Sequence, residues 1–290
     1  MSQTHATVIW LSEAPRVLYT ACWELGVVPQ LGKTPLVHFH NPGAALTSAQ
    51  LLWRLERLDE LAPAWKNYVT TSERRSALAA GHPRIVWAHE HAILSTTRWQ
   101  ILEEPKVWDA CLVAALMRWK RHELAAEVPR LAVLAHKHAA APDYADGELE
   151  KLLQNATFLA ESGLWRGPDE VVRLYNASHA SLLLSAAEGG SRTAGESQLC
   201  GVPLVSTVCR GGRLETATPE FLRICLPTPE SVAQAVAAHV SCPPPAADVR
   251  SAFLEKQRRH RETFEDLAET PIAWDDLPHI GAWAHMETLC

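Results

Sequence analysis

The strongest constraint on the fold is a regular alternation between short apolar segments and longer amphipathic ones. The short segments have the length of strands, and the longer ones, such as 46–62 and 73–81, carry apolar residues at helical spacing. We expect strands at 7–11, 35–40, 67–72, 84–88, 108–116, 130–137, 156–160, 178–185 and 202–207, and later helices at 118–128, 146–156, 167–178, 191–200 and 229–240. Strands separated by helices of this length indicate βαβ units, and therefore an α/β fold with parallel sheets.

A polar, proline-containing stretch at 95–106 separates two such patterns and predicts a domain boundary with a hinge. We expect a small N-terminal Rossmann-like domain at 1–100 and a larger C-terminal one at 101–270. The aromatic tail, 271–290, is expected to pack back on the first domain. Two Rossmann-like halves place a cleft between the carboxyl ends of their sheets, where ligands bind in such folds.

Charge and cysteine content narrow the partners and the compartment. The net charge is −6 and basic runs are short, as at 256–261, so a nucleic-acid partner is disfavoured. The seven cysteines are scattered without a CxxC pair, which favours reduced thiols in a cytoplasmic protein, with Cys200 in the core. No apolar run approaches the ~18–20 residues that span a bilayer. We expect no transmembrane segment, and the sequence leaves peripheral membrane contact open.

The segment 185–200 combines a strand end, a glycine turn and a helix start. Gly189 and Gly190 let backbone N–H groups approach a ligand closely. Ser191 is placed to cap the helix, whose free N–H groups attract anions. The turn therefore predicts an anion-binding edge of the sheet.

Two glutamates flank this turn, and two more glycines follow it. Glu188 lies in the turn, Glu196 lies about two turns into the helix, and Gly211 and Gly212 end the loop after the next strand. Glycine loops and a helix N-terminus that face one cleft suit a diphosphate, and a carboxylate further in suits sugar or ribose hydroxyls. Glu196 is also placed to form a capping pair with Thr193. The plain alternative is that Glu188 is a solvated turn residue and Glu196 an ordinary helix carboxylate.

The order of these elements resembles the donor-binding half of retaining GT-B glycosyltransferases, which use nucleotide sugars and carry an E-x7-E motif. The motif here is Glu188 to Glu196, followed by the segments 201–206 and 210–212. The resemblance extends over about 108–240 and is only architectural in the first half, which in this family lies on the acceptor side. It implies sugar transfer from a nucleotide-diphosphate donor to an acceptor hydroxyl with retention. It also implies that Glu188 lies beside the donor sugar and that Glu196 binds the ribose.

The same resemblance implies a role for the basic segment after the strand at 108–116. Lys120 matches the lysine that neutralises the donor diphosphate. The family usually places an arginine five residues earlier, where this chain has Ala115, and Arg118 or Arg121 is then the candidate for the second positive charge. With the Gly211, Gly212 and helix N-terminal amides, these groups would stabilise the leaving diphosphate in place of a metal ion.

Several histidines and acidic residues are further candidates for a site. His38 and His40 alternate with Phe39 and therefore share one side of their strand, and the resemblance makes either a candidate beside the donor sugar. The sequence His89-Glu90-His91 offers two metal ligands at most, so we expect no metal site there. No Asp-x-Asp motif is present, and the pair at 275–276 is expected at the surface. We therefore expect no cofactor and no metal.

Other readings of the chain stay open at this point. One is a catalytically degenerate GT-B-like protein that binds a nucleotide or scaffolds a partner, because Ala115 replaces the usual arginine and the first half is short. Another is a GT-B-type epimerase, whereas a phosphorylase would need a cofactor lysine and a longer chain. The sugar, the base, the acceptor and the oligomeric state are not identified by the sequence.

Overall fold

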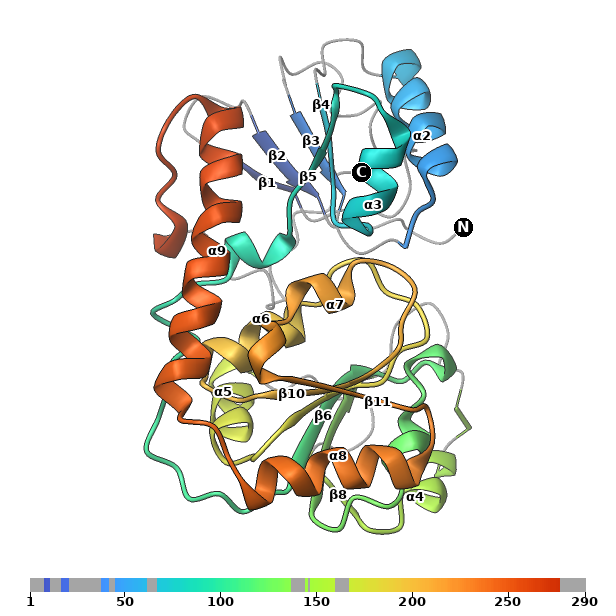
Figure 1. Cartoon of the computed structure of the whole chain (residues 1–290), viewed down its shortest axis with the longest axis vertical. Helices are drawn as coiled ribbons and strands as arrows, with labels where there is room; N and C mark the ends of the chain where they lie inside the picture. The colour runs from blue at the N-terminus through green and yellow to red at the C-terminus, as the bar shows by residue number, and fades with distance from the viewer. Residues whose placement is uncertain are drawn as a thin grey trace.

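The computed structural model describes residues 8–10, 17–20, 38–41, 45–61, 67–136, 144–145, 147–159 and 167–276, and only the backbone of the strands before residue 45. Its strands form two separate sheets of five and six strands. Figure 1 shows the two sheets one above the other, with a long helix running beside both. The expected α/β fold with parallel sheets is confirmed.

The first sheet has the order β1-β2-β3-β4-β5. Its strands are β1 (Val8–Trp10), β2 (Val17–Thr20), β3 (His38–Asn41), β4 (Asn67–Thr70) and β5 (Ile85–Trp87). All neighbours are parallel except β1 and β2. Strand β2 was not predicted from the sequence. The helices are α2 (Ser48–Leu61) and α3 (Arg74–Ala80), and α3 ends at Gly81 with φ 62°.

The second sheet is fully parallel and has the order β11-β10-β9-β6-β7-β8. Its strands are β6 (Ala110–Ala115), β7 (Leu131–His136), β8 (Ala156–Phe158), β9 (Ser181–Leu183), β10 (Leu204–Thr207) and β11 (Leu222–Cys225). The chain proceeds from β6 to β8 in one direction and from β9 to β11 in the other. The strand order therefore reverses between β6 and β9, and ligands of open α/β sheets bind outside the carboxyl ends at such a point.

Helices cover both faces of this sheet, and apolar clusters fill the space on each side. They are α4 (Glu148–Leu152), α5 (Pro168–Asn176), α6 (Arg192–Leu199), α7 (Arg213–Thr216) and α8 (Pro229–Ser241). The helix expected at 118–128 is instead two short 3-10 helices, η3 (Arg118–Lys120) and η4 (His122–Ala125). Arg121 between them has φ 54°, a left-handed conformation that a continuous α-helix cannot contain.

The long helix α9 (Ala246–Ala268) packs against both halves of the molecule (Figure 1). Its buried face consists of Val249, Phe253, Gln257, His260, Phe264 and Ala268. Phe253 joins the cluster beneath the second sheet, whereas Phe264 packs with Val69 of β4 and with Trp274. The tail beyond residue 276 lies outside the described residues. None of the helices in the described ranges is both long and apolar enough to cross a membrane.

Candidate functional site

The fold brings Lys120 and Glu188 together at the switch point of the second sheet. Lys120 follows β6 and Glu188 follows β9, the two strands between which the order reverses. The Lys120 Nζ lies 2.6 Å from the Glu188 Oε1, and the two side chains are 15% and 14% exposed. The amide of Ala186 donates to the carbonyl of Trp119 at 2.9 Å, which ties the two loops together. The site therefore presents a partly exposed ion pair at the edge where α/β folds bind ligands.

A second cation, Arg213 at the start of α7, approaches the same glutamate. Its Nη1 lies 3.9 Å from the Glu188 Oε2, and the side chain is 0% exposed. Its guanidinium donates to the Ser185 carbonyl at 2.8 Å and to the Thr207 carbonyl at 2.7 Å. Burial lowers the pKa of Arg213, and the Glu188 carboxylate opposes that effect. The sequence analysis missed this residue, although an arginine directly after Gly-Gly at the candidate edge was a usable signal.

The two arginines expected near the diphosphate are engaged with other groups. The Arg118 Nη2 lies 2.7 Å from a carboxylate oxygen of Glu148, and its guanidinium lies 4.9 Å from the centre of the Tyr144 ring. The Arg121 guanidinium donates to the Leu184 carbonyl at 2.6 Å and to the Thr207 hydroxyl at 2.6 Å. Arg118 thus pairs with α4, and Arg121 holds the carboxyl ends of β9 and β10. Their role toward a donor stays a prediction.

The glycine turn after Glu188 is closely packed. A Cβ atom on Gly190 would lie 3.0 Å from the Oε1 of Glu90, so a larger residue would crowd that buried carboxylate. Ser191 occupies the N-cap position of α6, but its side chain forms no capping hydrogen bond. Its hydroxyl lies 3.0 Å from that of Thr193 instead. Ser191 therefore lies at the expected N-cap position, but the capping hydrogen bond expected from its side chain is wrong.

Gly211 and Gly212 bring the backbone of the second half into close contact with the first half. Gly211 has φ 103°, and its amide donates to the Glu73 Oε1 at 3.0 Å. A Cβ atom on Gly211 would lie 2.0 Å from the Glu188 carbonyl oxygen, and one on Gly212 would lie 2.4 Å from that of Thr71. Only glycine fits at these positions. The Glu73 carboxylate of the first half therefore accepts a hydrogen bond from the Gly211 amide, which we predicted would bind the diphosphate.

Glu196 lies on α6 with its carboxylate facing α5. The Tyr175 hydroxyl donates to the Glu196 Oε2 at 3.2 Å. Burial raises the pKa of Glu196 to about 7, and the Glu90 carboxylate adds to that rise while Arg192 opposes it. The expected pairing with Thr193 is not what holds it. Cys200 at the end of the same helix is 1% exposed, as expected for a core thiol.

The four histidines considered as site residues fall into two groups. His38 and His40 lie in β3, where they pair with Asn67 and Val69 of β4, and their role beside a donor stays a prediction. His89 and His91 were expected on an extended segment but are fully buried around η2 (Glu90–Ile93). Their rings stack with centroids 4.9 Å apart. Among the described residues, no group of three His, Cys, Asp or Glu side chains is arranged to hold a metal ion.

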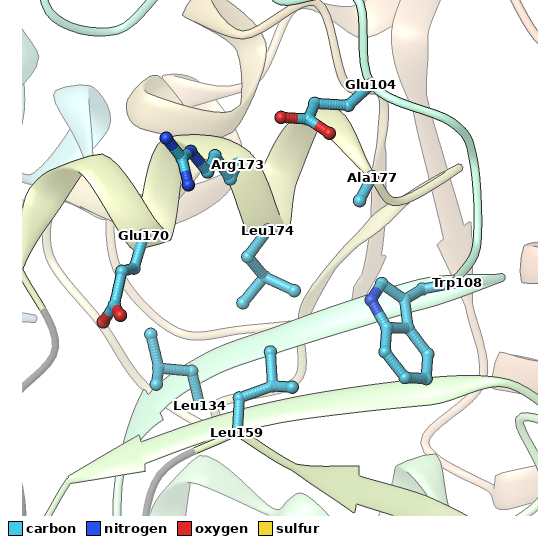
Figure 2. Close-up of a pocket in the computed structure, with 8 residues that line it drawn as sticks. All are labelled: Glu104, Trp108, Leu134, Leu159, Glu170, Arg173, Leu174 and Ala177. Carbon is cyan, nitrogen blue, oxygen red and sulfur yellow. The ribbon is translucent and has the colours of Figure 1, made fainter.

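A pocket of about 350 Å³ lies between α5 and the strands β7 and β8 (Figure 2). It is lined by Glu104, Trp108, Leu134, Leu159, Glu170, Arg173, Leu174 and Ala177. Figure 2 shows Leu134, Leu159 and Trp108 on one side of the pocket, with Arg173, Leu174 and Glu104 on the opposite side. None of these residues belongs to the ion pair at the switch point. The pocket is therefore a separate feature of the second half.

Comparisons with known proteins identify the class of fold. No family model and no curated protein sequence matches the chain. TarM matches at TM-score 0.62 and 10% identity over 83% of this chain and 53% of its own. Anabaena HepE in complex with UDP matches at TM-score 0.61 and 15% identity over 88% of this chain and 79% of its own. Sucrose-phosphate synthase from Thermosynechococcus elongatus matches at TM-score 0.54 and 16% identity over 81% of this chain and 66% of its own.

These structural neighbours are GT-B glycosyltransferases, whose fold consists of Rossmann-like domains. This chain has the same α/β fold, with parallel sheets in both halves. It spans about half of TarM and just under two thirds of the sucrose-phosphate synthase. At these identities the likeness establishes the fold.

Proposed function

We propose that the chain is a glycosyltransferase that moves a sugar from a nucleotide-diphosphate donor to an acceptor hydroxyl with retention. The observation that carries this proposal is the ion pair of Lys120 and Glu188 at the switch point of the second sheet. The solved structure of HepE contains UDP, and its fold covers 88% of this chain. A donor of the UDP type is therefore the first ligand to test.

In this proposal each charged group near the switch point contacts a different part of the donor. Lys120 faces the diphosphate, Glu188 the donor sugar and Glu196 the ribose. The bond from the anomeric carbon to the diphosphate oxygen breaks and a bond to the acceptor oxygen forms. The proton of the acceptor hydroxyl passes to the departing diphosphate or to solvent. Negative charge grows on the departing diphosphate, and a fixed ammonium group in a water-poor cleft stabilises that charge in place of a metal ion.

The division of the chain follows from the same proposal. Residues 1–100 form the acceptor-side domain, 101–270 the donor domain, and 271–290 the tail that returns to the first. The long helix α9 supports this division, because Trp274 just beyond it packs with Phe264 and with Val69 of the first sheet. The stretch 95–106 is the proposed hinge. We place the protein in the cytoplasm on the basis of its scattered cysteines.

A specific observation favours a second candidate, a catalytically degenerate GT-B-like protein that binds a nucleotide or scaffolds a partner. The Gly211 amide is bound by Glu73, and Arg118 is paired with Glu148 rather than left available for a donor diphosphate. A chain that no longer transfers sugar would tolerate both arrangements. Turnover of nucleotide sugars separates the two candidates, since only the enzyme releases the diphosphate.

Nucleotide binding tests both candidates at once. We would measure thermal shifts with UDP, GDP, ADP and CMP in the presence of EDTA. One diphosphate should stabilise the protein, and Lys120→Ala should lower its affinity about 10- to 100-fold, because charge-assisted hydrogen bonds contribute about 1.5–3 kcal/mol. Glu196→Ala should also weaken binding.

The matched control is Glu150→Ala, which removes an exposed carboxylate from α4. It should leave nucleotide affinity unchanged. If no nucleotide shifts the wild-type protein, the donor-site proposal fails. If one binds but no sugar nucleotide is turned over with a panel of acceptors, the degenerate candidate is favoured.

A further inference from the structure

A buried cation beside the proposed site is not used by the chemistry above. Arg213 is fully buried, and its guanidinium is held by two backbone carbonyls and by the Ser206 hydroxyl at 3.0 Å. These contacts come from the carboxyl ends of β9 and β10 and fix the guanidinium in one place. A guanidinium held by these hydrogen bonds cannot move toward a ligand. We therefore expect Arg213 to act on the charged side chain that already lies beside it.

That neighbour is Glu188, whose two carboxylate oxygens face different cations. Oε1 lies 2.6 Å from the Lys120 Nζ, and Oε2 lies 3.9 Å from the Arg213 Nη1. The Cys209 thiol also lies close to Glu188. Burial raises the pKa of this thiol, Arg213 opposes that rise, and the Glu188 carboxylate adds to it. Lys120 is partly exposed, whereas Arg213 is not. Of the two cations, only Lys120 is therefore accessible to an incoming anion.

An arriving diphosphate would compete with Glu188 for Lys120. Without a second cation, Glu188 would remain as a poorly solvated carboxylate beside the negatively charged diphosphate. Two negative charges that lie close together in a partly buried site repel each other strongly. We propose that Arg213 is a positioning residue, which neutralises and orients Glu188 while Lys120 binds the diphosphate. This inference rests on the proposed function and adds to it a residue that never touches the donor.

The first test needs no ligand. A double-mutant cycle compares the Tm of wild type, Arg213→Met, Glu188→Gln and the double variant at pH 7. If the two side chains interact as proposed, the combined change should differ from the sum of the single changes by about 2–4 °C or more. Additive changes would overturn the pairing. Arg213→Lys, which retains the charge, gives a second measurement if Arg213→Met fails to fold.

The second test uses the affinity for UDP, measured by calorimetry. Arg213→Met should weaken UDP binding about tenfold or more, because it leaves Glu188 unpaired beside the anion. Adding Glu188→Gln to that variant should restore most of the lost affinity, and Arg213→Lys should stay within about threefold of wild type. A purely structural arginine would show no such rescue.

Arg223→Met is the matched control, since it removes an exposed arginine from β11. It should leave UDP affinity unchanged. Loss of UDP binding in Arg213→Met that Glu188→Gln does not rescue would overturn the inference. If the wild-type protein binds no nucleoside diphosphate, the proposed function fails, and the stability cycle still decides whether Arg213 positions Glu188.

Discussion

At the scale of single residues, Glu196 shows how burial changes the chemistry of a carboxyl group. Its nearest partner is the hydroxyl of Tyr175, a fully buried residue, and its pKa is raised to about 7, mainly by burial. In the unfolded chain the same group titrates near its ordinary value. Because the folded pKa is the higher one, the folded state holds this proton over a pH range in which the unfolded state has lost it.

The free energy of unfolding should therefore fall as the pH rises from about 4.5 to about 7. Above pH 7 the folded state carries the full energetic cost of an ionised Glu196. Glu196→Gln removes the ionisable group and keeps its shape. We expect this variant to be more stable than wild type at pH 8, by about 1–3 kcal/mol, and to differ little at pH 4. Thermal unfolding across this range measures the difference. An equal difference at both pH values would contradict the role of ionisation.

The sequence was sufficient to predict some of these residues and insufficient for others. Lys120 and Glu188 each follow a strand of the second sheet, and a parallel sheet brings the carboxyl ends of neighbouring strands together. Their meeting was therefore predictable in principle. The contact of Arg213 with Glu188 depends on the loop after β10, and that of Glu73 with Gly211 depends on how the two halves meet. Local patterns contain neither piece of information.

At the scale of elements, strands and helices with a clear period were predicted well. Strands β6 to β10 and helices α5, α6 and α8 lie where the pattern placed them, whereas strand β11 was not predicted. Helix α9 was missed, because its charged run at 256–261 hides a buried stripe spaced three and four residues apart. The segment 118–128 was predicted as one helix from the alternation of strand-like and helix-like segments. A left-handed residue, Arg121, divides it, and composition does not reveal such a conformation.

The stripe on α9 predicts where that helix is most sensitive. Phe253 is fully buried, lies 5.1 Å from the His91 ring and joins the cluster beneath the second sheet. Phe253→Ala should lower the free energy of unfolding by about 3–5 kcal/mol, since a large cavity replaces the ring. Urea denaturation measures this loss. Arg259→Ala, on the exposed face of the same helix, should cost less than about 1 kcal/mol. A comparably small loss for Phe253→Ala would show that neighbouring side chains move into the space left by the ring.

At the scale of the whole molecule, the two halves meet through a reciprocal pair of contacts. The Gly211 amide of the second half donates to Glu73 of the first at 3.0 Å. The Arg74 amide of the first half donates to Glu215 of the second at 2.9 Å. Each half thus offers one carboxylate to a backbone amide of the other. The first contact adjoins the proposed donor site, because a Cβ atom on Gly211 would collide with the Glu188 carbonyl.

This arrangement predicts that Glu73 competes with the donor diphosphate for the Gly211 amide. Glu73→Ala should strengthen UDP binding about three- to tenfold, because one hydrogen bond contributes about 0.5–1.5 kcal/mol and a nearby negative charge is removed. Glu215→Ala is the matched control, since it breaks the mirror contact and leaves the Gly211 amide bound. It should lower the Tm slightly without strengthening UDP binding. Calorimetric titration of both variants measures the difference. Weaker UDP binding in Glu73→Ala alone would mean that this carboxylate supports the donor site, and a gain in both variants would assign the effect to loosening of the two halves.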